Sequence, residues 1–169
     1  MSDKQLSVLV DTSFLISLYD DTRPNHKVAK KYHKYFIKHS IVMCLSPIVI
    51  AEFHQMQSIV DVVGSGNYRI IPFNYDDGLN SADIAYKLGG VSRKRDGTNP
   101  KYKDDLKLIA QTVTEDISFI ITEDKSTLAR YCTKLQSAKV LNTKVIVLSD
   151  AYDESWFNGG QATLVANID

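Results

Sequence analysis

The chain has 169 residues, of which 44% are apolar and 24% charged, and its 20 basic and 20 acidic side chains give a formal charge of zero. This length fits a single domain (1–169), and the composition excludes a disordered or low-complexity chain. No uncharged stretch approaches the ~20 residues of a membrane span, and the short apolar patch after Asp3 and Lys4 does not predict a signal peptide. We therefore expect a cytoplasmic protein with no membrane partner.

The spacing of apolar residues alternates between that of strands and that of helices. In chain order it predicts a strand at 6–10, a helix at 25–38, a strand at 41–45, a helix at 46–63, a strand at 68–73, helices at 75–88 and 101–114, a strand at 117–122, a helix at 126–135 and a strand at 145–148. A loop is expected at 91–100, and a tail of unclear role follows at 149–169. Strands alternating with helices favour the α/β class, as a three-layer α/β/α arrangement with a central parallel sheet.

The zero net charge conceals two basic clusters. No acid lies between Thr22 and Ala51, where six lysines and arginines and three histidines stand, and a second basic cluster runs from Arg93 to Lys103. Such a local excess suits a phosphate backbone, although a solvated helix face is the simpler explanation of the first cluster alone. The candidate RNA contacts are Lys27, Lys30, Lys34, Arg93, Arg95 and Lys103.

Two aspartates follow predicted strands. Asp11 comes directly after the 6–10 strand, and Asp124 follows the 117–122 strand with one residue between. Parallel strands end at the same edge of a sheet, where the chemistry of open α/β folds is found. Both carboxylates are therefore expected at that edge, with helix capping as the alternative role for Asp11.

Two further acids lie on predicted helices. At 100° per residue, Glu52 lines up with apolar residues four, seven and eleven positions later, where a carboxylate needs a compensating cation or donor. A salt bridge is the alternative, but no Lys or Arg lies within ten residues of Glu52. Asp105 lies at the edge of the apolar stripe of the 101–114 helix, whereas Asp104 faces solvent as a helix-start charge or an outer helper.

Four acids from separate elements suggest a cluster. Packed carboxylates raise one another's pKa unless cations neutralise them, and Mg²⁺ or Mn²⁺ prefers such oxygen ligands. Zinc is disfavoured because no histidine lies at ligand spacing, and His54 points to a different helix face from Glu52.

Four segments, in order, resemble the motifs of the PIN-domain nucleases. They are 8–16 around Asp11, 46–53 with Glu52, 105–112 beginning at Asp105, and 119–124 ending in Thr122-Glu123-Asp124. The resemblance covers 6–148 and implies an α/β/α fold whose acidic quartet (Asp11, Glu52, Asp105, Asp124) binds Mg²⁺ or Mn²⁺. It also implies that Ser13 and Thr122 hold a ligand carboxylate or a water. The chain departs from the family after Asp124, where Lys125-Ser126-Thr127 stands in place of a further acid or Asn.

The resemblance implies a metal-dependent endoribonuclease that hydrolyses RNA phosphodiester bonds. Its RNA would be single-stranded or structured, and its partners a small antitoxin protein, as in toxin–antitoxin pairs, or a second copy of the chain. The alternative is a catalytically weak or inactive PIN-like module that binds RNA or protein. A phosphatase with Asp11 as nucleophile is disfavoured, because it would need a second aspartate where Ser13 stands.

Overall fold

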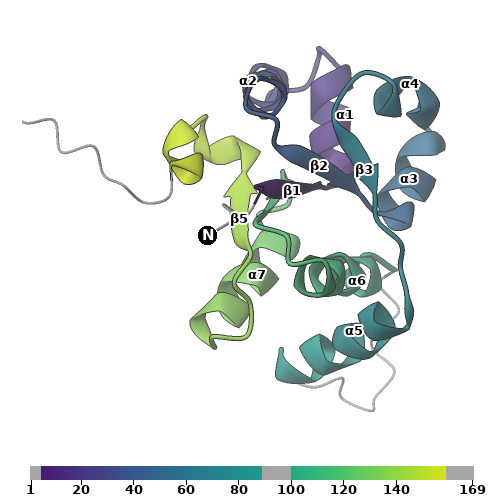
Figure 1. The fold of residues 1–169 in the computed structure, drawn as a ribbon, viewed down its shortest axis with the longest axis vertical. Coiled ribbons are helices and arrows are strands. Elements are labelled where there is room, and N and C mark those ends of the chain that lie inside the picture. The colour runs from purple at the N-terminus through teal and green to yellow at the C-terminus, as the bar shows by residue number, and fades with distance from the viewer. Residues whose placement is uncertain (1–4, 89–99, 159–169) are drawn as a thin grey trace, which may run out of the picture.

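A five-stranded sheet lies between two layers of helices in the computed structural model, which describes residues 5–88 and 100–158 (Figure 1). All pairings are parallel, and the strand order is β3-β2-β1-β4-β5. The strands are β1 (Ser7–Val10), β2 (Val42–Leu45), β3 (Tyr68–Ile70), β4 (Phe119–Thr122) and β5 (Lys144–Val147). The expected α/β/α fold with a central parallel sheet is therefore confirmed.

Helices cover both faces of the sheet. One layer holds α1 (Thr12–Tyr19), α2 (His26–Lys38), α3 (Pro47–His54) and α4 (Ile59–Val63) (Figure 1). The other holds α6 (Pro100–Thr114) and α7 (Leu128–Ser137), with α5 (Tyr75–Lys87) packed along α6. Helix α6 is therefore enclosed between the sheet and α5.

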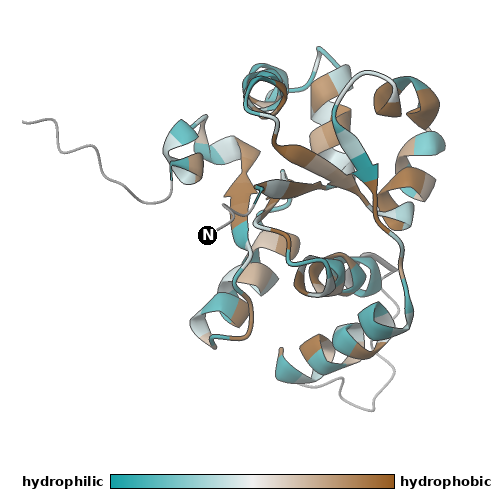
Figure 2. Ribbon diagram, in the orientation of Figure 1, coloured by the Kyte–Doolittle hydropathy of each residue, from teal (hydrophilic) through white to brown (hydrophobic). Residues whose placement is uncertain are grey.

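The central strands form the core, and their carboxyl ends lie at the same edge of the sheet. Leu9 of β1 pairs with Cys44 of β2 on one side and with Ile120 of β4 on the other. Every residue of β1 and β4 is buried, and the sheet is hydrophobic over most of its length (Figure 2). Because both neighbours run parallel to β1, the residues that follow β1 and β4 emerge at one edge.

Two expectations for the first helical layer were wrong. Residues 12–19 form α1 directly after β1, whereas no helix was predicted between the strand at 6–10 and the helix at 25–38. The single helix expected at 46–63 is divided into α3 and α4, because the backbone of Ser58 is extended, with φ −60° and ψ 115°. The Phe53 carbonyl closes the end of α3 by accepting from the backbone N–H groups of Met56 and Gln57. The Nδ1 atom of His54 then accepts from the N–H of Ile59, the first residue of α4.

The remaining elements lie close to their predicted bounds. Strand β3 ends at Ile70 rather than at 73, and Pro72, which has no N–H to donate, follows two residues later. The predicted loop at 91–100 falls outside the described residues except for Pro100, which opens α6.

The described part of the C-terminal tail completes the core. Two 3₁₀ helices, Leu148–Asp150 and Glu154–Phe157, follow β5. The ring of Phe157 lies 4.9 Å from that of Tyr35 and 5.0 Å from that of Phe119 between centroids. The Tyr32 hydroxyl donates to the Ala151 carbonyl at 3.2 Å. Residues 148–157 therefore pack between α2 and the sheet and contact both.

Two further features of the described residues concern the cysteines and the hydropathy of the helices. Cys44 and Cys132 are free and buried, and burial raises the pKa of both thiols, that of Cys132 to about 12. Across residues 5–88 and 100–158, none of the helices combines the length and the hydropathy that a membrane span requires.

Candidate active site

A pocket of about 250 Å³ lies at the carboxyl ends of β1 and β4 and is lined mainly by acids. Its carboxylates are Asp11, Glu52, Asp104, Asp105 and Asp124. They come from the end of β1, from α3, from α6 and from the turn after β4. The four acids that the sequence analysis grouped, and the helper beside them, therefore meet in one place.

Two hydroxyls orient the carboxylate of Asp11. Ser13 Oγ donates to Asp11 Oδ2 at 2.6 Å, and Thr122 Oγ1 donates to the same oxygen at 2.7 Å. Both hydroxyls accept a backbone N–H, Ser13 from Glu123 and Thr122 from Asp124, each at 2.9 Å. Their own protons are thus directed at Asp11, which is 9% exposed.

Asp105 is the most perturbed acid of the pocket. Burial, together with the nearby charges of Asp11, Asp124 and Glu52, raises the pKa of Asp105 to about 7, although the Thr127 hydroxyl opposes this. Its Oδ2 atom is buried and has no hydrogen-bond partner among the described residues. An unpaired buried carboxylate oxygen is costly unless a proton or a cation satisfies it.

Asp124 has its oxygens engaged at the start of α7. Oδ1 accepts from the backbone N–H groups of Ser126 and Thr127 and from the Ser126 hydroxyl at 2.9–3.0 Å, and the Thr127 hydroxyl donates to Oδ2. Burial acts to raise the pKa of Asp124, but these donors outweigh it and the pKa is lowered. Asp124 therefore caps the turn before α7 and keeps its negative charge at the pocket.

Glu52 reaches the pocket for a reason other than the predicted one. The expected stripe shared with Met56 does not exist, because α3 ends at His54 and Met56 is 61% exposed. Glu52 is half-buried, and Thr12 at the start of α1 donates its hydroxyl proton to Glu52 Oε2. The compensating donor is therefore a hydroxyl from a neighbouring helix rather than a lysine.

Asp104 was expected to face solvent, but the structure places it in the lining of the pocket. Its side chain is 31% exposed, lines the pocket and pairs with Lys107 at 2.8 Å. The buried face of α6 includes Gln111 and Thr112, whereas the apolar Val113 is 43% exposed. Packing between the sheet and α5 leaves only a narrow part of this helix open to solvent.

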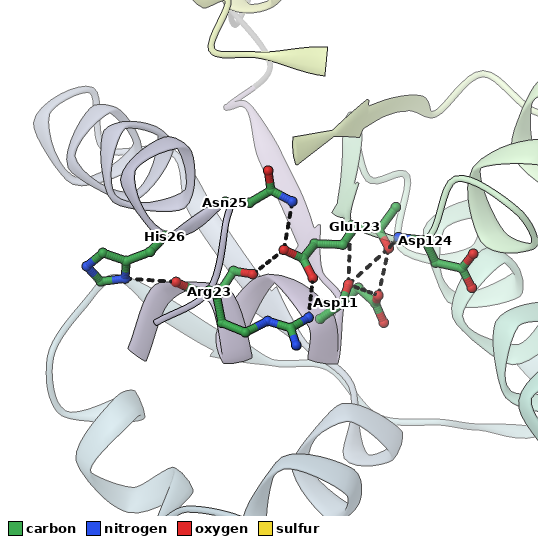
Figure 3. A network of polar contacts seen from close by, with 9 residues as sticks. Asp11, Arg23, Asn25, His26, Glu123 and Asp124 are labelled. Carbon is green, nitrogen blue, oxygen red and sulfur yellow. Dashed lines mark hydrogen bonds and ion pairs between the residues drawn. The ribbon is translucent and has the colours of Figure 1, made fainter. Parts of the chain in front are cut away.

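Glu123, for which no role was predicted from the sequence, lies at the centre of a network of polar contacts (Figure 3). Its side chain is 13% exposed and accepts from Arg23 Nη2 at 2.8 Å, from Asn25 Nδ2 at 2.9 Å and from the Ser17 hydroxyl. Burial acts to raise the pKa of Glu123, but these donors lower it below its ordinary value. Its position between Thr122 and Asp124 is the one sequence feature that could have indicated a role for Glu123. Its contacts with Ser17, Arg23 and Asn25 connect the segment between α1 and α2 to the site.

The candidate RNA contacts lie on the surface where they are described. Lys27, Lys30 and Lys34 are exposed along α2, and Lys103 is exposed in the first turn of α6. Arg93 and Arg95 fall outside the described residues. Contact of these residues with RNA stays a prediction.

The donor set of the pocket fits a hard divalent cation. Its side chains offer carboxylate oxygens, the ligands that Mg²⁺ and Mn²⁺ prefer, and the buried Asp105 Oδ2 is one that lacks a donor. Within the described part of the chain, however, no three acidic, histidine or cysteine side chains are already gathered closely enough to hold a metal ion. Hydroxyl groups instead donate to the carboxylates of Asp11, Glu52 and Asp124.

Comparison with known proteins supports the fold rather than a close relationship. No family model and no curated protein matches this chain. One similar solved structure is that of VapBC2 from Rickettsia felis bound to a DNA fragment from its promoter. The alignment with one of its chains covers 84% of the present chain and 98% of that chain, with 14% identity and a TM-score of 0.54. VapC20 from Mycobacterium tuberculosis, a Sarcin-Ricin loop cleaving toxin, aligns over 80% and 98% with 16% identity and a TM-score of 0.49.

The first of these similarities shows that the chain has the three-layer PIN-like fold. The resemblance to PIN-domain nucleases, which rested on four short motifs, is thereby confirmed at the level of the fold.

Proposed function

We propose that this protein is a metal-dependent endoribonuclease that hydrolyses RNA phosphodiester bonds at the acidic pocket. The observation that carries the proposal is the meeting of Asp11, Glu52, Asp105 and Asp124 in one pocket at the carboxyl edge of a PIN-like sheet. Four packed carboxylates repel one another, so their arrangement has a physical use when a cation neutralises them. A module that only binds RNA or protein has no such use for them.

The proposed cofactor is Mg²⁺ or Mn²⁺, which when bound would supply charge neutralisation at the phosphodiester and a lowered pKa for an attacking water. The chain's own residues prepare its ligands. Ser13 and Thr122 fix the orientation of Asp11, and Asp105 offers the buried oxygen that lacks a donor. Asp124, whose pKa is lowered, contributes a carboxylate that stays ionised at neutral pH.

RNA is the proposed substrate, and a small antitoxin protein is the proposed partner. The similar chain of known structure is part of VapBC2, which was crystallised bound to a DNA fragment from its promoter. A protein partner for the present chain is proposed from the shared fold, which is an argument by analogy. A homodimer and a cytoplasmic location stay predictions.

The test is cleavage of single-stranded RNA by the purified protein with Mn²⁺ or Mg²⁺ and with EDTA. We expect cleavage only with metal, and its loss in Asp11→Asn and in Asp105→Asn, with circular dichroism spectra unchanged. Asp76→Asn is the matched control, because Asp76 is an exposed acid on α5 outside the pocket lining. Cleavage at the parental rate by Asp11→Asn would contradict the proposal, and RNA binding without cleavage by the parent would favour the binding module.

A further inference from the structure

Two cations lie next to the acidic pocket, and an acid holds each of them in place. Arg23 Nη2 is 2.8 Å from Glu123 Oε2, and Lys107 Nζ is 2.8 Å from Asp104 Oδ1. Glu123 precedes Asp124, and Asp104 precedes Asp105 in the chain. We call Arg23 and Lys107 the flanking cations.

The flanking cations approach the pocket from opposite layers of the fold. Arg23 lies between α1 and α2 in one helical layer, and Lys107 lies on α6 in the other (Figure 1). The N–H of Glu123 donates to Ser13, which lines the pocket, so the Arg23 guanidinium is one side chain removed from the lining (Figure 3). Asp104 is itself part of the lining. A single-stranded RNA bound across the pocket would therefore contact one cation on each side.

Both flanking cations keep donors available for an anion. The Arg23 side chain is 42% exposed and that of Lys107 is 39% exposed. Each ion pair joins one nitrogen to one carboxylate oxygen, whereas a guanidinium carries five N–H donors and an ammonium three. Their positions are also fixed before binding, so less side-chain freedom is lost than for a free surface lysine. Lys27, Lys30 and Lys34 form no ion pair with any described residue.

An acidic pocket repels the phosphates on either side of the bond it acts on, and substrate therefore needs positive contacts nearby. We propose that Arg23 and Lys107 bind backbone phosphates of single-stranded RNA on the two sides of the acidic pocket, with Glu123 and Asp104 orienting them. The flanking cations are thus substrate-positioning residues for the hydrolysis, and this inference rests on the proposed function. The longer row of exposed lysines on α2 then adds attraction at a distance rather than a defined contact.

The experiment measures binding of a fluorescein-labelled 12-nucleotide oligouridylate by anisotropy between 50 and 300 mM KCl. All variants carry Asp11→Asn and are measured with Mg²⁺, so that the oligonucleotide stays intact. Arg23→Gln and Lys107→Gln each remove one flanking cation, and Arg23→Lys keeps the charge without the planar fork. Lys144→Gln is the matched control, because Lys144 is an exposed cation at the start of β5, at the opposite edge of the sheet.

We expect Arg23→Gln and Lys107→Gln each to weaken binding roughly five- to tenfold at low salt. The slope of log K against log salt should fall in magnitude by about 0.7 for each, and by about 1.4 for the double variant. Arg23→Lys should retain the parental slope, and Lys144→Gln should change neither quantity. A purely structural role would instead lower the melting temperature without changing the slope.

The inference is overturned if the slopes of Arg23→Gln and Lys107→Gln equal that of Lys144→Gln while the Asp11→Asn parent still binds RNA. Should Arg23→Gln fail to fold, Lys107→Gln decides the matter by the same criterion. If the Asp11→Asn parent binds no RNA at 50 mM KCl, the inference is likewise overturned, whereas failure of the protein without substitutions to cleave RNA with Mn²⁺ or Mg²⁺ would overturn the proposed function. The two failures are therefore distinguishable.

Discussion

Replacing Asp105 by asparagine should stabilise the protein above neutral pH while abolishing its proposed activity. The native carboxyl has a pKa of about 7 against an ordinary value of 3.8, so the folded chain holds the proton more tightly than the unfolded chain does. Stability contributed by this proton is full below about pH 4 and is lost as the pH rises to about 7. Asp105→Asn removes the titrating carboxyl, so the variant does not lose this stability as the pH rises.

The magnitude follows from the same pKa. Between pH 5 and pH 8, one proton released at pH 7 rather than at 3.8 corresponds to a loss of at most about 2.7 kcal/mol. Asp105 is half-buried, so solvent screening reduces this, and we expect the advantage of Asp105→Asn over the parent to grow by about 1–2 kcal/mol across that interval. The carboxylates with lowered pKa, Asp124 and Glu123, are the same in both proteins and cancel in the comparison.

The assay is urea denaturation of both proteins in EDTA at pH 5, 6, 7 and 8. Asp104→Asn is the matched control, because Asp104 adjoins Asp105 but is paired with Lys107. That control should not become more stable relative to the parent as the pH rises. The reasoning is refuted if Asp105→Asn is no more stable than the parent at pH 8, or if its advantage is the same at pH 5 and pH 8.

Three further substitutions test the surroundings of the pocket. Thr122→Val removes a buried donor to Asp11, so it should destabilise the protein by about 1–3 kcal/mol in urea and slow RNA cleavage roughly 10–100-fold; parental values for both would argue against the orienting role. Glu123→Gln should cost about 1–3 kcal/mol because it removes the charge that pairs with Arg23, and an unchanged denaturation midpoint would count against the cluster. Phe157→Ala should cost about 2–4 kcal/mol, and a smaller loss in the same assay would show that the tail does not complete the core.

The sheet could be predicted because its strands are buried on both faces. Strands β1 and β4 consist largely of uninterrupted apolar residues, which is the pattern of a parallel sheet covered by helices. Helix α1 could not be found in the same way. Four of its eight residues are buried and it packs on both α2 and α3, so its sequence has no clear polar face.

The acidic residues of the candidate site could be predicted from the sequence, but their hydrogen-bond partners could not. Asp11 and Asp124 could be placed from the ends of their strands alone. Glu52 was grouped with them correctly, although the argument assumed a continuous helix that the structure divides after His54. The role of Glu123 depends on Ser17, Arg23 and Asn25, about 100 residues earlier in the chain, and no local pattern records such contacts.

The most direct measurement of the central idea is an anomalous difference map from crystals of the protein soaked in Mn²⁺. We expect a peak within ligand distance of carboxylate oxygens of Asp11 and Asp105, with Glu52 and Asp124 beside it, and no such peak in Asp11→Asn crystals soaked identically. A peak elsewhere on the protein, or none in this pocket at a saturating concentration, would contradict it.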